Sequence, residues 1–227
     1  MKSSSQIPVI TIDGPGGAGK GTISTLIAER LGWHYLDSGA MYRLLALAAL
    51  QQGITSNDVH SLIDISAKMK IAFSAKRDEG ADAPEVWLND DKVSSAIRSE
   101  KCGVMASEIA VHAAVREVLL ARQKAFRQAP GLVADGRDMG TVVFPDAKLK
   151  VFLTATAEER AHRRYKQLIT KGIDVILYDL LKDIRGRDER DATRLVSPLR
   201  PAEDAIVIDT TDLTIDQVVE QIMNLRG

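Results

Sequence analysis

A glycine-rich run near the N-terminus has the spacing of a phosphate-binding loop. It reads GPGGAGKGT, follows a β-branched run and opens a helical pattern. Glycines let successive backbone N–H groups point at phosphate oxygens, the helix N-terminus adds partial positive charge, and Lys20 supplies a mobile cation for the outer phosphates. The run therefore predicts a site for a nucleoside triphosphate. Its predicted members are Gly14, Pro15, Gly16, Gly17, Ala18, Gly19, Lys20, Gly21 and Thr22.

The loop departs from the general pattern at one position. Gly21 stands where a Ser or Thr usually ligates magnesium, and the hydroxyl comes one place later, in Thr22. Direct ligation of magnesium by a hydroxyl of this loop is therefore in doubt, and the glycine run by itself could also be a turn without a ligand.

Two arginines stand where a second phosphate could be held. Transfer between two polyanions needs positive charge where the phosphates meet, and the planar fork of arginine bonds two oxygens at once. Arg43 follows a predicted turn, and Arg137 comes shortly after the apolar run 131–134. Both could therefore lie at the carboxyl edge of a parallel sheet, where ligands bind in such folds. A surface ion pair is the alternative for each.

A third concentration of charge lies between residues 158 and 194. A segment of this kind can close over bound nucleotides as a lid, exclude water and bring an arginine to the transferred group. Its arginines are Arg160, Arg163, Arg164, Arg185, Arg187, Arg190 and Arg194. Of these, Arg160, Arg164 and Arg190 are expected to form pairs on the helix surface with Glu158, Glu159 or Asp188.

The whole chain sets bounds on these sites. Its 227 residues, 45% hydrophobic and 27% charged, indicate one globular domain or a core with an insertion. Thirty basic and 31 acidic residues give a formal charge of −1, so no global field attracts nucleic acid or an anionic membrane. Cys102 is the single cysteine and is expected to be buried, and no apolar run is long enough to span a membrane. A cytoplasmic protein is predicted.

Short, nearly continuous apolar runs alternate with helical patterns along the chain. Such runs are typical of parallel strands that are buried on both faces. They cover residues 8–13, 33–36, 131–134, 149–153 and 205–208. Helical spacing follows the first two runs, at 22–31 and 40–52. The order predicts an α/β fold with a doubly wound parallel sheet flanked by helices.

One region interrupts this order, from about Met69 to Arg98. Alternating segments at 70–74, 85–88 and 92–93 surround a polar stretch at 76–84 and a turn at 89–91. This pattern predicts an antiparallel meander inserted into the core. A single long helix is predicted after it, over residues 103–128.

Three longer runs resemble the bacterial cytidylate kinases, which are P-loop nucleoside monophosphate kinases. They read DSGAMYR at 37–43, ADGRDMGTVVFPD at 134–146 and RDERD at 187–191, and the Gly-Lys-Gly-Thr ending of the loop agrees with them. The resemblance spans residues 9–210. It implies a single P-loop kinase domain over 1–227, with a small antiparallel insert at about 66–106 in the monophosphate-binding region and an arginine-rich lid at about 158–194.

The resemblance also implies an activity and its residues. The reaction is transfer of the γ-phosphoryl of ATP to CMP or dCMP with magnesium, by a monomer that binds neither nucleic acid nor membrane. Asp135 is implied to orient magnesium through water, and a turn carboxylate is the alternative. The implied catalytic residues are Lys20, Arg137, Arg163 and Arg187. The implied CMP-binding residues are Ser38, Tyr42, Arg43, Ser107, Arg116, Arg137, Asp138, Arg187, Asp191 and Arg194.

Within that set, the chemistry of Asp138 suits recognition of the cytosine base. Its carboxylate can accept a hydrogen bond from the cytosine N4 amino group, which uracil lacks. For Ser107 and Arg116, a solvated place on a helix is the alternative.

Two other functions remain open on sequence alone. One is a P-loop kinase for another small acceptor, such as UMP, shikimate or a coenzyme precursor, and a panel of acceptors separates it from a cytidylate kinase. The other is a nucleotide-dependent switch. Against the switch, the chain has no Asn-Lys-x-Asp guanine motif, and an arginine-rich lid has no use in it.

Overall fold

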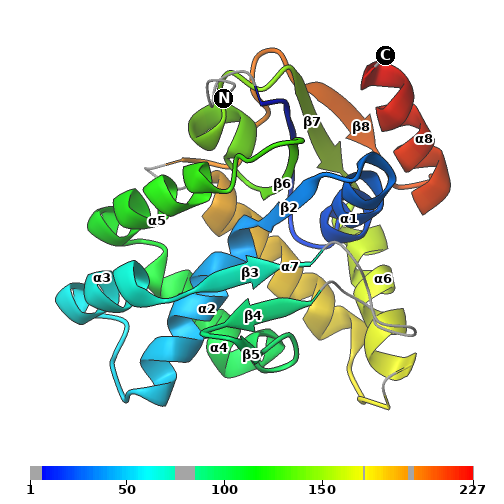
Figure 1. Ribbon diagram of the computed structural model, residues 1–227. Helices are drawn as coiled ribbons and strands as arrows, with labels where there is room; N and C mark the ends of the chain where they lie inside the picture. The colour runs from blue at the N-terminus through cyan, green and yellow to red at the C-terminus, as the bar shows by residue number, and fades with distance from the viewer. Residues whose placement is uncertain (1–6, 75–84, 171, 194–196, 227) are drawn as a thin grey trace. The chain divides into compact units, whose positions relative to one another are not determined.

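The computed structural model describes residues 7–74, 85–170, 172–193 and 197–226. Contacts between Cα atoms divide the chain into two compact units. The first unit consists of residues 1–8 and 28–135, and the second unit consists of residues 9–27 and 136–227. Figure 1 shows the helices and strands of both.

Parallel strands form the sheet of the second unit. β1 (Val9–Asp13) pairs with β7 (Leu149–Thr154), with Ile12 opposite Val151, and β7 pairs in turn with β8 (Ile206–Asp209). All five residues of β1 and the first five of β7 are buried. Burial on both faces explains why these segments read as continuous apolar runs rather than as alternating ones.

Helices of the second unit follow these strands along the chain. α1 (Lys20–Leu31) begins after the loop that leaves β1, and α8 (Ile215–Arg226) packs against β7. α6 (Ala157–Thr170) and α7 (Leu177–Ala192) pack against each other, as Figure 1 shows in yellow and orange. A five-residue π-helix, η3 (Met139–Val143), precedes β7. The loops that leave β1 and β7 at their carboxyl ends thus lead into α1 and α6, an arrangement that in α/β folds places ligands at that edge.

The first unit contains a second parallel pair of strands. β2 (His34–Asp37) pairs with β6 (Leu132–Gly136), with Tyr35 opposite Val133. Gly131 comes just before β6, and a Cβ there would lie 2.3 Å from the ring of Trp33. Only a glycine lets the backbone approach the indole so closely.

Helices surround this pair in the first unit. α2 (Ser38–Gln51) packs against α3 (Val59–Lys68), α4 (Glu100–Ile109) and the short 3₁₀ helix η2 (Ala96–Arg98), and α3 packs against α5 (Ala113–Ala125). The apolar side of α2 is buried throughout, which agrees with its sequence rich in Leu and Ala.

The predicted meander is confirmed as a three-stranded antiparallel sheet. It consists of β3 (Ile71–Phe73), β4 (Val86–Leu88) and β5 (Asp91–Lys92), in that order. Asn89 and Asp90 connect β4 to β5 with φ values of 51° and 73°. Two consecutive left-handed residues are typical of a tight hairpin turn, and Asn and Asp tolerate that conformation best after glycine. Residues 75–84, which include the predicted polar stretch, lie outside the described residues.

The prediction of one long helix over 103–128 is wrong. The chain forms α4 and α5 instead, with residues 110–112 between them. His112 has extended backbone angles, and its Nε2 lies 2.8 Å from the carbonyl oxygen of Ser56. A contact between residues 56 positions apart cannot be read from local periodicity, which continues across the break.

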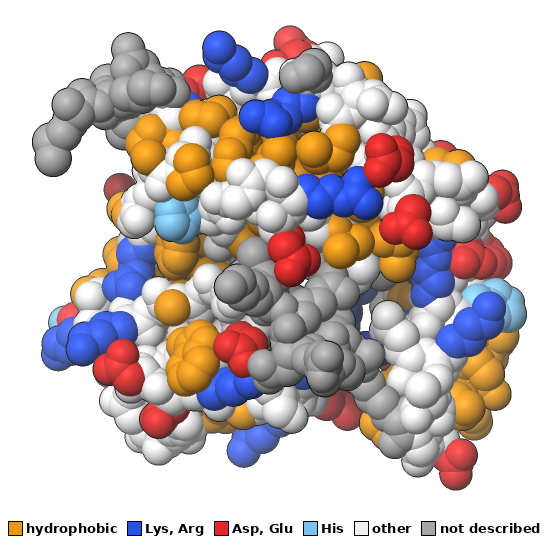
Figure 2. Space-filling model, turned by 45° about the vertical axis from the view of Figure 1, so that its right-hand side comes forward, with side chains coloured by type: hydrophobic (Ala, Val, Ile, Leu, Met, Phe, Trp, Pro, Cys, Tyr) orange, Lys and Arg blue, Asp and Glu red, His pale blue; other side chains and the backbone are white. Residues whose placement is uncertain are grey.

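The fold class is α/β, with a central parallel sheet flanked by helices and a small separate antiparallel sheet, as the sequence predicted. Among the described residues, no helix combines the length and the apolar character that crossing a membrane requires. On the face drawn in Figure 2, acidic and basic side chains lie interspersed, which agrees with a formal charge of −1.

Candidate functional site

The glycine-rich loop lies between β1 and α1. Gly14 has a φ of +148°, and a Cβ there would lie 2.1 Å from the backbone oxygen of Leu153, so β7 leaves room only for glycine. Lys20 is the first residue of α1, and its Nζ donates a hydrogen bond to the carbonyl oxygen of Pro15 at 2.9 Å. The lysine therefore folds back over the loop, where the partial positive charge of the helix N-terminus adds to its own.

A buried carboxylate lies directly before this loop. Asp13 ends β1, and its two oxygens accept hydrogen bonds from the backbone N–H groups of Met139 (2.9 Å) and Gly140 (2.8 Å). Burial raises the pKa of Asp13 to about 6; the two hydrogen bonds and the charge of Lys20 lower it in part, while the charge of Asp138 raises it. The sequence analysis missed this residue. The available signal was a single acidic residue at the end of an apolar strand.

Arg137 and Asp191, both predicted to bind the acceptor, lie together in the second unit. The Nε of Arg137 donates to Oδ2 of Asp191 at 2.6 Å, and the Asp191 side chain is only 3% exposed. A charged hydrogen bond of this kind fixes the orientation of the guanidinium group. The two terminal nitrogens of the guanidinium group are the ones suited to bidentate contact with a phosphate.

The predicted lid arginine Arg187 lies beside the phosphate loop. A Cβ built on Gly16 would be 3.9 Å from both Cδ and one terminal nitrogen of Arg187, which belongs to α7. The structure therefore brings a cation from the predicted lid next to the loop that is predicted to hold the donor phosphates.

The prediction that Arg160 pairs with one of Glu158, Glu159 and Asp188 is confirmed for Asp188, but the predicted location at the helix surface is wrong. Its side chain is buried, and two of its nitrogens bond the carboxylate of Asp188 at 2.9 and 2.5 Å. It also donates to the carbonyl oxygens of Gly16 (3.1 Å) and Ala155 (3.0 Å). Arg160 thus joins the phosphate loop to α7. Asp188 could be named as a candidate partner from the sequence. The burial of Arg160 could not, because it depends on Gly16, which lies 144 residues away along the chain.

Arg163, the other predicted catalytic arginine of the lid, makes a different set of contacts. Its Nε donates to Glu159 one helical turn earlier at 2.9 Å, and its terminal nitrogens donate to Oγ1 (3.2 Å) and the carbonyl oxygen (2.5 Å) of Thr210. The Thr210 hydroxyl in turn lies 3.4 Å from the carbonyl oxygen of Ala18 in the phosphate loop. Thr210 therefore links Arg163 to that loop.

Arg43 lies in the first unit, on α2. One terminal nitrogen of its guanidinium group donates to the carbonyl oxygen of Ile97 in η2 at 2.8 Å, and the group packs on Gly103 of α4, where a Cβ would lie 3.1 Å from it. The buried thiol of Cys102 donates to the carbonyl oxygen of Arg43 at 3.1 Å. The region predicted as the insert therefore holds the arginine predicted to bind the acceptor phosphate.

The remaining predicted acceptor residues of the first unit lie on separate helices. Ser38 is buried at the start of α2, and Tyr42 lies one turn later, next to Arg43. Ser107 is exposed on α4, where its hydroxyl donates to the carbonyl oxygen of Gly103 at 3.1 Å, and Arg116 lies on α5. Ser107 and Arg116 thus do not share one helix, contrary to the prediction. Arg194 lies outside the described residues.

Asp135 is the residue best suited to a cation in the first unit. It lies on β6, opposite Asp37 of β2, and is 6% exposed, with the hydroxyl of Tyr35 at 3.4 Å from one carboxylate oxygen. In the part of the chain that the structure describes, no cluster of three or more His, Cys, Asp or Glu side chains forms a metal cage. One carboxylate without a cage fits magnesium, which keeps its waters and binds mainly through substrate phosphates.

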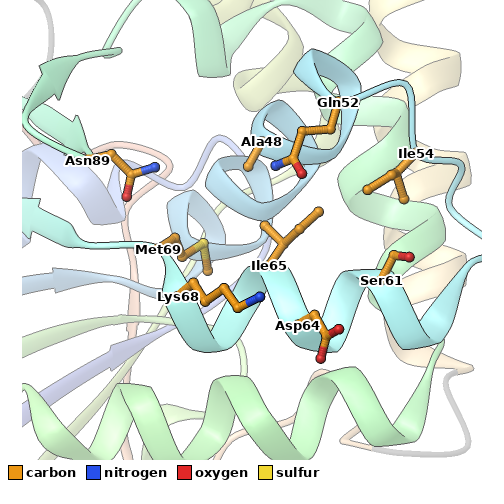
Figure 3. A pocket seen from close by; sticks show the side chains of 9 residues that line it. All are labelled: Ala48, Gln52, Ile54, Ser61, Asp64, Ile65, Lys68, Met69 and Asn89. Carbon is orange, nitrogen blue, oxygen red and sulfur yellow. The ribbon is translucent and has the colours of Figure 1, made fainter.

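A cavity of about 300 Å³ in the first unit is a separate feature. Figure 3 shows that it lies between α2 and α3, with Ile65 and Met69 on one side, Ala48 and Gln52 on another, and Asn89 at its rim. None of the lining residues belongs to the predicted site. The lining carries one acidic and one basic side chain, Asp64 and Lys68, among apolar and neutral polar groups, and it contains no glycine-rich loop or arginine that would mark a phosphate site.

Comparison with known proteins shows which family of sequences this chain resembles. The family model described as cytidylate kinase matches residues 10–226. A cytidylate kinase from Marinomonas sp. (strain MWYL1) is 59% identical over 217 residues, which cover 96% of this chain and 94% of that protein. A cytidylate kinase from Ralstonia pickettii (strain 12J) is 55% identical over 217 residues, with 96% and 90% covered.

A solved structure of an uncharacterised protein from Eubacterium ventriosum ATCC 27560 is similar in fold. The two chains share 13% identity with a TM-score of 0.50, and the match covers 97% of this chain and 98% of the other. At that identity the likeness bears on the fold alone.

Proposed function

The chain belongs to the cytidylate kinase family and is an ATP-dependent nucleoside monophosphate kinase, and we propose that it transfers the γ-phosphoryl of ATP to CMP or dCMP by in-line displacement. The observation that carries the proposal is the identity of 52 to 59% to cytidylate kinases along nearly the whole chain. In-line transfer needs no covalent intermediate on the enzyme, because the acceptor phosphate oxygen is already anionic.

The donor is held by the loop from Gly14 to Thr22. Its backbone N–H groups and the N-terminus of α1 bind the phosphates, and Lys20 leaves the carbonyl oxygen of Pro15 for the outer phosphates as they arrive. The support for this assignment is the left-handed or strained glycine backbone of the loop, which only glycine adopts without cost.

The acceptor is held by charge and by base reading. Arg43 and Arg137 bind the CMP phosphate; the support is that a bond to Ile97 orients the first guanidinium group and a bond to Asp191 orients the second. Asp138 accepts from the cytosine N4 amino group. The other assigned contacts are those of Ser38, Tyr42, Ser107, Arg116, Arg187, Asp191 and Arg194, with Asp191 at the sugar hydroxyls.

Magnesium is the assigned metal, and it neutralises charge on the phosphates when bound. Asp135 holds its waters rather than the ion itself, since a single buried carboxylate with Tyr35 beside it provides one oxygen-rich contact. Gly21 has no hydroxyl to offer, so this chain relies on Asp135 and the phosphates instead.

The segment 158–194, which includes most of α6 and all of α7, acts as the lid. Arg187 lies beside Gly16 and neutralises the charge of the transferred group. Arg163, which bonds Thr210 next to the phosphate loop, adds positive charge there. The segment 66–106 is the monophosphate-side insert within a single kinase domain, and the bond from Arg43 to Ile97 supports that assignment.

The test is a panel of acceptors under one set of conditions. Initial rates of ADP formation are measured with ATP, magnesium and each of CMP, dCMP, UMP and AMP. The proposal expects kcat/KM for CMP or dCMP to exceed that for AMP by at least about a hundredfold, since a site built for one set of base hydrogen bonds rejects another strongly. Equal values for CMP and AMP exclude the assigned acceptor.

A further inference from the structure

Asp13 is a buried charge that the proposed reaction does not use. It is 5% exposed, and both carboxylate oxygens are bonded, one to the N–H of Met139 and one to the N–H of Gly140. Burying a carboxylate is costly, and its pKa is raised accordingly.

The two N–H groups need an acceptor from outside their own segment. Met139 and Gly140 begin η3, in which the N–H groups of Val142 and Val143 bond the carbonyl oxygen of Asp138. The first N–H groups of a helix have no partner inside it. Asp13 therefore caps η3, and it does so from β1 rather than from the residue before the helix, since the Asp138 side chain makes no capping bond.

Close packing also restricts the backbone at Gly140. A Cβ on Gly140 would lie 2.9 Å from Oγ1 of Thr11, 3.2 Å from Cδ of Lys150 and 3.4 Å from Oδ2 of Asp13. Thr11 and Lys150 lie opposite each other on β1 and β7. The backbone at Gly140 is thus held against the sheet, with the carboxylate as its polar attachment.

The residues held in this way directly follow two assigned acceptor ligands. We propose that Asp13 is a positioning residue that fixes Arg137 and Asp138 for the acceptor nucleotide, by anchoring the backbone that follows them to the strand that enters the phosphate loop. The inference rests on the proposed roles of Arg137 and Asp138. Asp13 itself touches no substrate and takes no part in the transfer.

The geometry separates this role from support of the phosphate loop. The backbone of Asp13 pairs with Phe152 of β7, and Gly14 lies against the backbone of Leu153 with no room for a Cβ, so the backbone course of the loop does not depend on the carboxylate. The carboxylate acts on the loop through its charge interaction with Lys20, which is why the ATP constants are measured as well. An asparagine at this position keeps the size of the side chain. However, it offers one acceptor, and its amide group faces the second N–H with another donor.

The test measures both substrates of the Asp13→Asn variant. The inference expects kcat/KM for CMP to fall by roughly tenfold to a hundredfold, the scale of a displaced positioning group, while KM for ATP stays within about threefold of wild type. Asp216→Asn is the control, because it removes an exposed carboxylate of the same unit, in the first turn of α8, that lies outside the site. Both constants of the control are expected to match wild type.

A second variant covers the case in which Asp13→Asn does not fold. Gly140→Ala keeps the carboxylate and disturbs the same contact through its Cβ, and the same selective loss toward CMP is expected. Unchanged constants for CMP in a folded variant overturn the inference, and so does an equal loss toward CMP and ATP, which indicates general support of the sheet. A wild-type chain that does not phosphorylate CMP contradicts the proposed function instead, before any variant is compared.

Discussion

At the scale of single residues, Lys20 separates function from stability most cleanly. Its Nζ bonds the loop carbonyl of Pro15, and its half-buried side chain is not part of the apolar core. We expect Lys20→Ala to lower kcat by about 10² to 10³, the cost of removing one group aimed at charge in the transition state. Circular dichroism and the unfolding midpoint are expected to stay near wild type. Lys148→Ala, an exposed lysine of the same unit, is the control, and near-normal turnover of Lys20→Ala contradicts the assignment of the loop.

The raised pKa of Asp13 predicts how the effect of replacing this residue depends on pH. The ionised carboxylate accepts both N–H bonds, and with a pKa of about 6 it is ionised above that pH and protonated below it. The charged groups facing it are Asp138 and Lys20, with the stem of Lys150 against Gly140. We expect the ratio of kcat/KM for CMP, wild type over Asp13→Asn, to be largest above pH 7 and to approach one as the pH falls below 6.

The ratio is the right quantity because the phosphate of CMP also titrates, and its effect cancels between the two enzymes. Protonated aspartic acid resembles asparagine in offering one good acceptor, which is why the two enzymes converge at low pH. A ratio that stays constant from pH 5 to pH 8 contradicts the assigned role of the charge.

At the scale of elements, α6 and α7 are joined by one buried ion pair and one exposed ion pair, which should contribute differently to stability. Arg160 and Asp188 form a bidentate pair in which the arginine side chain is 5% exposed, whereas Arg185 and Glu158 join the same helices at the surface. We expect a double-mutant cycle of Arg160→Met and Asp188→Asn to give a coupling of about 1 to 2 kcal/mol in the free energy of unfolding. The estimate is modest because Asp188 is 30% exposed.

The control for that cycle uses the exposed pair. Arg185→Met and Glu158→Gln are expected to add without measurable coupling, because solvent screens such a pair. Denaturation by urea gives all of these free energies. Additive effects at Arg160 and Asp188 would show that α7 is held on the phosphate loop by other contacts.

The same elements show what local sequence could predict. The strands were predictable because burial on both faces leaves continuous apolar runs, and the hairpin at Asn89 because its residue types favour a left-handed turn. The break between α4 and α5 was not, since it depends on the bond from His112 to Ser56. The burial of Arg160 and the two bonds of Asp13 were missed for the same reason: their partners lie more than 100 residues away. The glycine loop was proposed as a site because its spacing is a local signal, and its role and that of Arg137 stay predictions.

At the scale of the whole molecule, the residues assigned to the donor phosphates lie in the second unit, whereas the residues assigned to the acceptor come from both units. The phosphate loop belongs to the second unit, whereas Arg43 and the antiparallel sheet belong to the first. Because Arg43 bonds Ile97 and packs on Gly103, we expect CMP to slow hydrogen exchange over residues 85–98, and an ATP analogue alone to do so much less. The loop at 14–22 is expected to show the opposite preference. Mass spectrometry of peptides with each ligand measures both, and equal protection of 85–98 by either nucleotide contradicts the link through Arg43.

The buried thiol of Cys102 has a practical consequence for spectroscopy. Burial raises its pKa, its side chain has no exposed surface, and only the thiolate reacts quickly with maleimides or disulfide reagents. We expect the native protein to resist such reagents at neutral pH and to react once in denaturant, which a colorimetric thiol assay measures. Since this is the only cysteine of the chain, a cysteine introduced on an exposed helix can be labelled selectively without first replacing the native one. A dye pair or spin label placed in this way reports on lid motion in an otherwise unaltered enzyme.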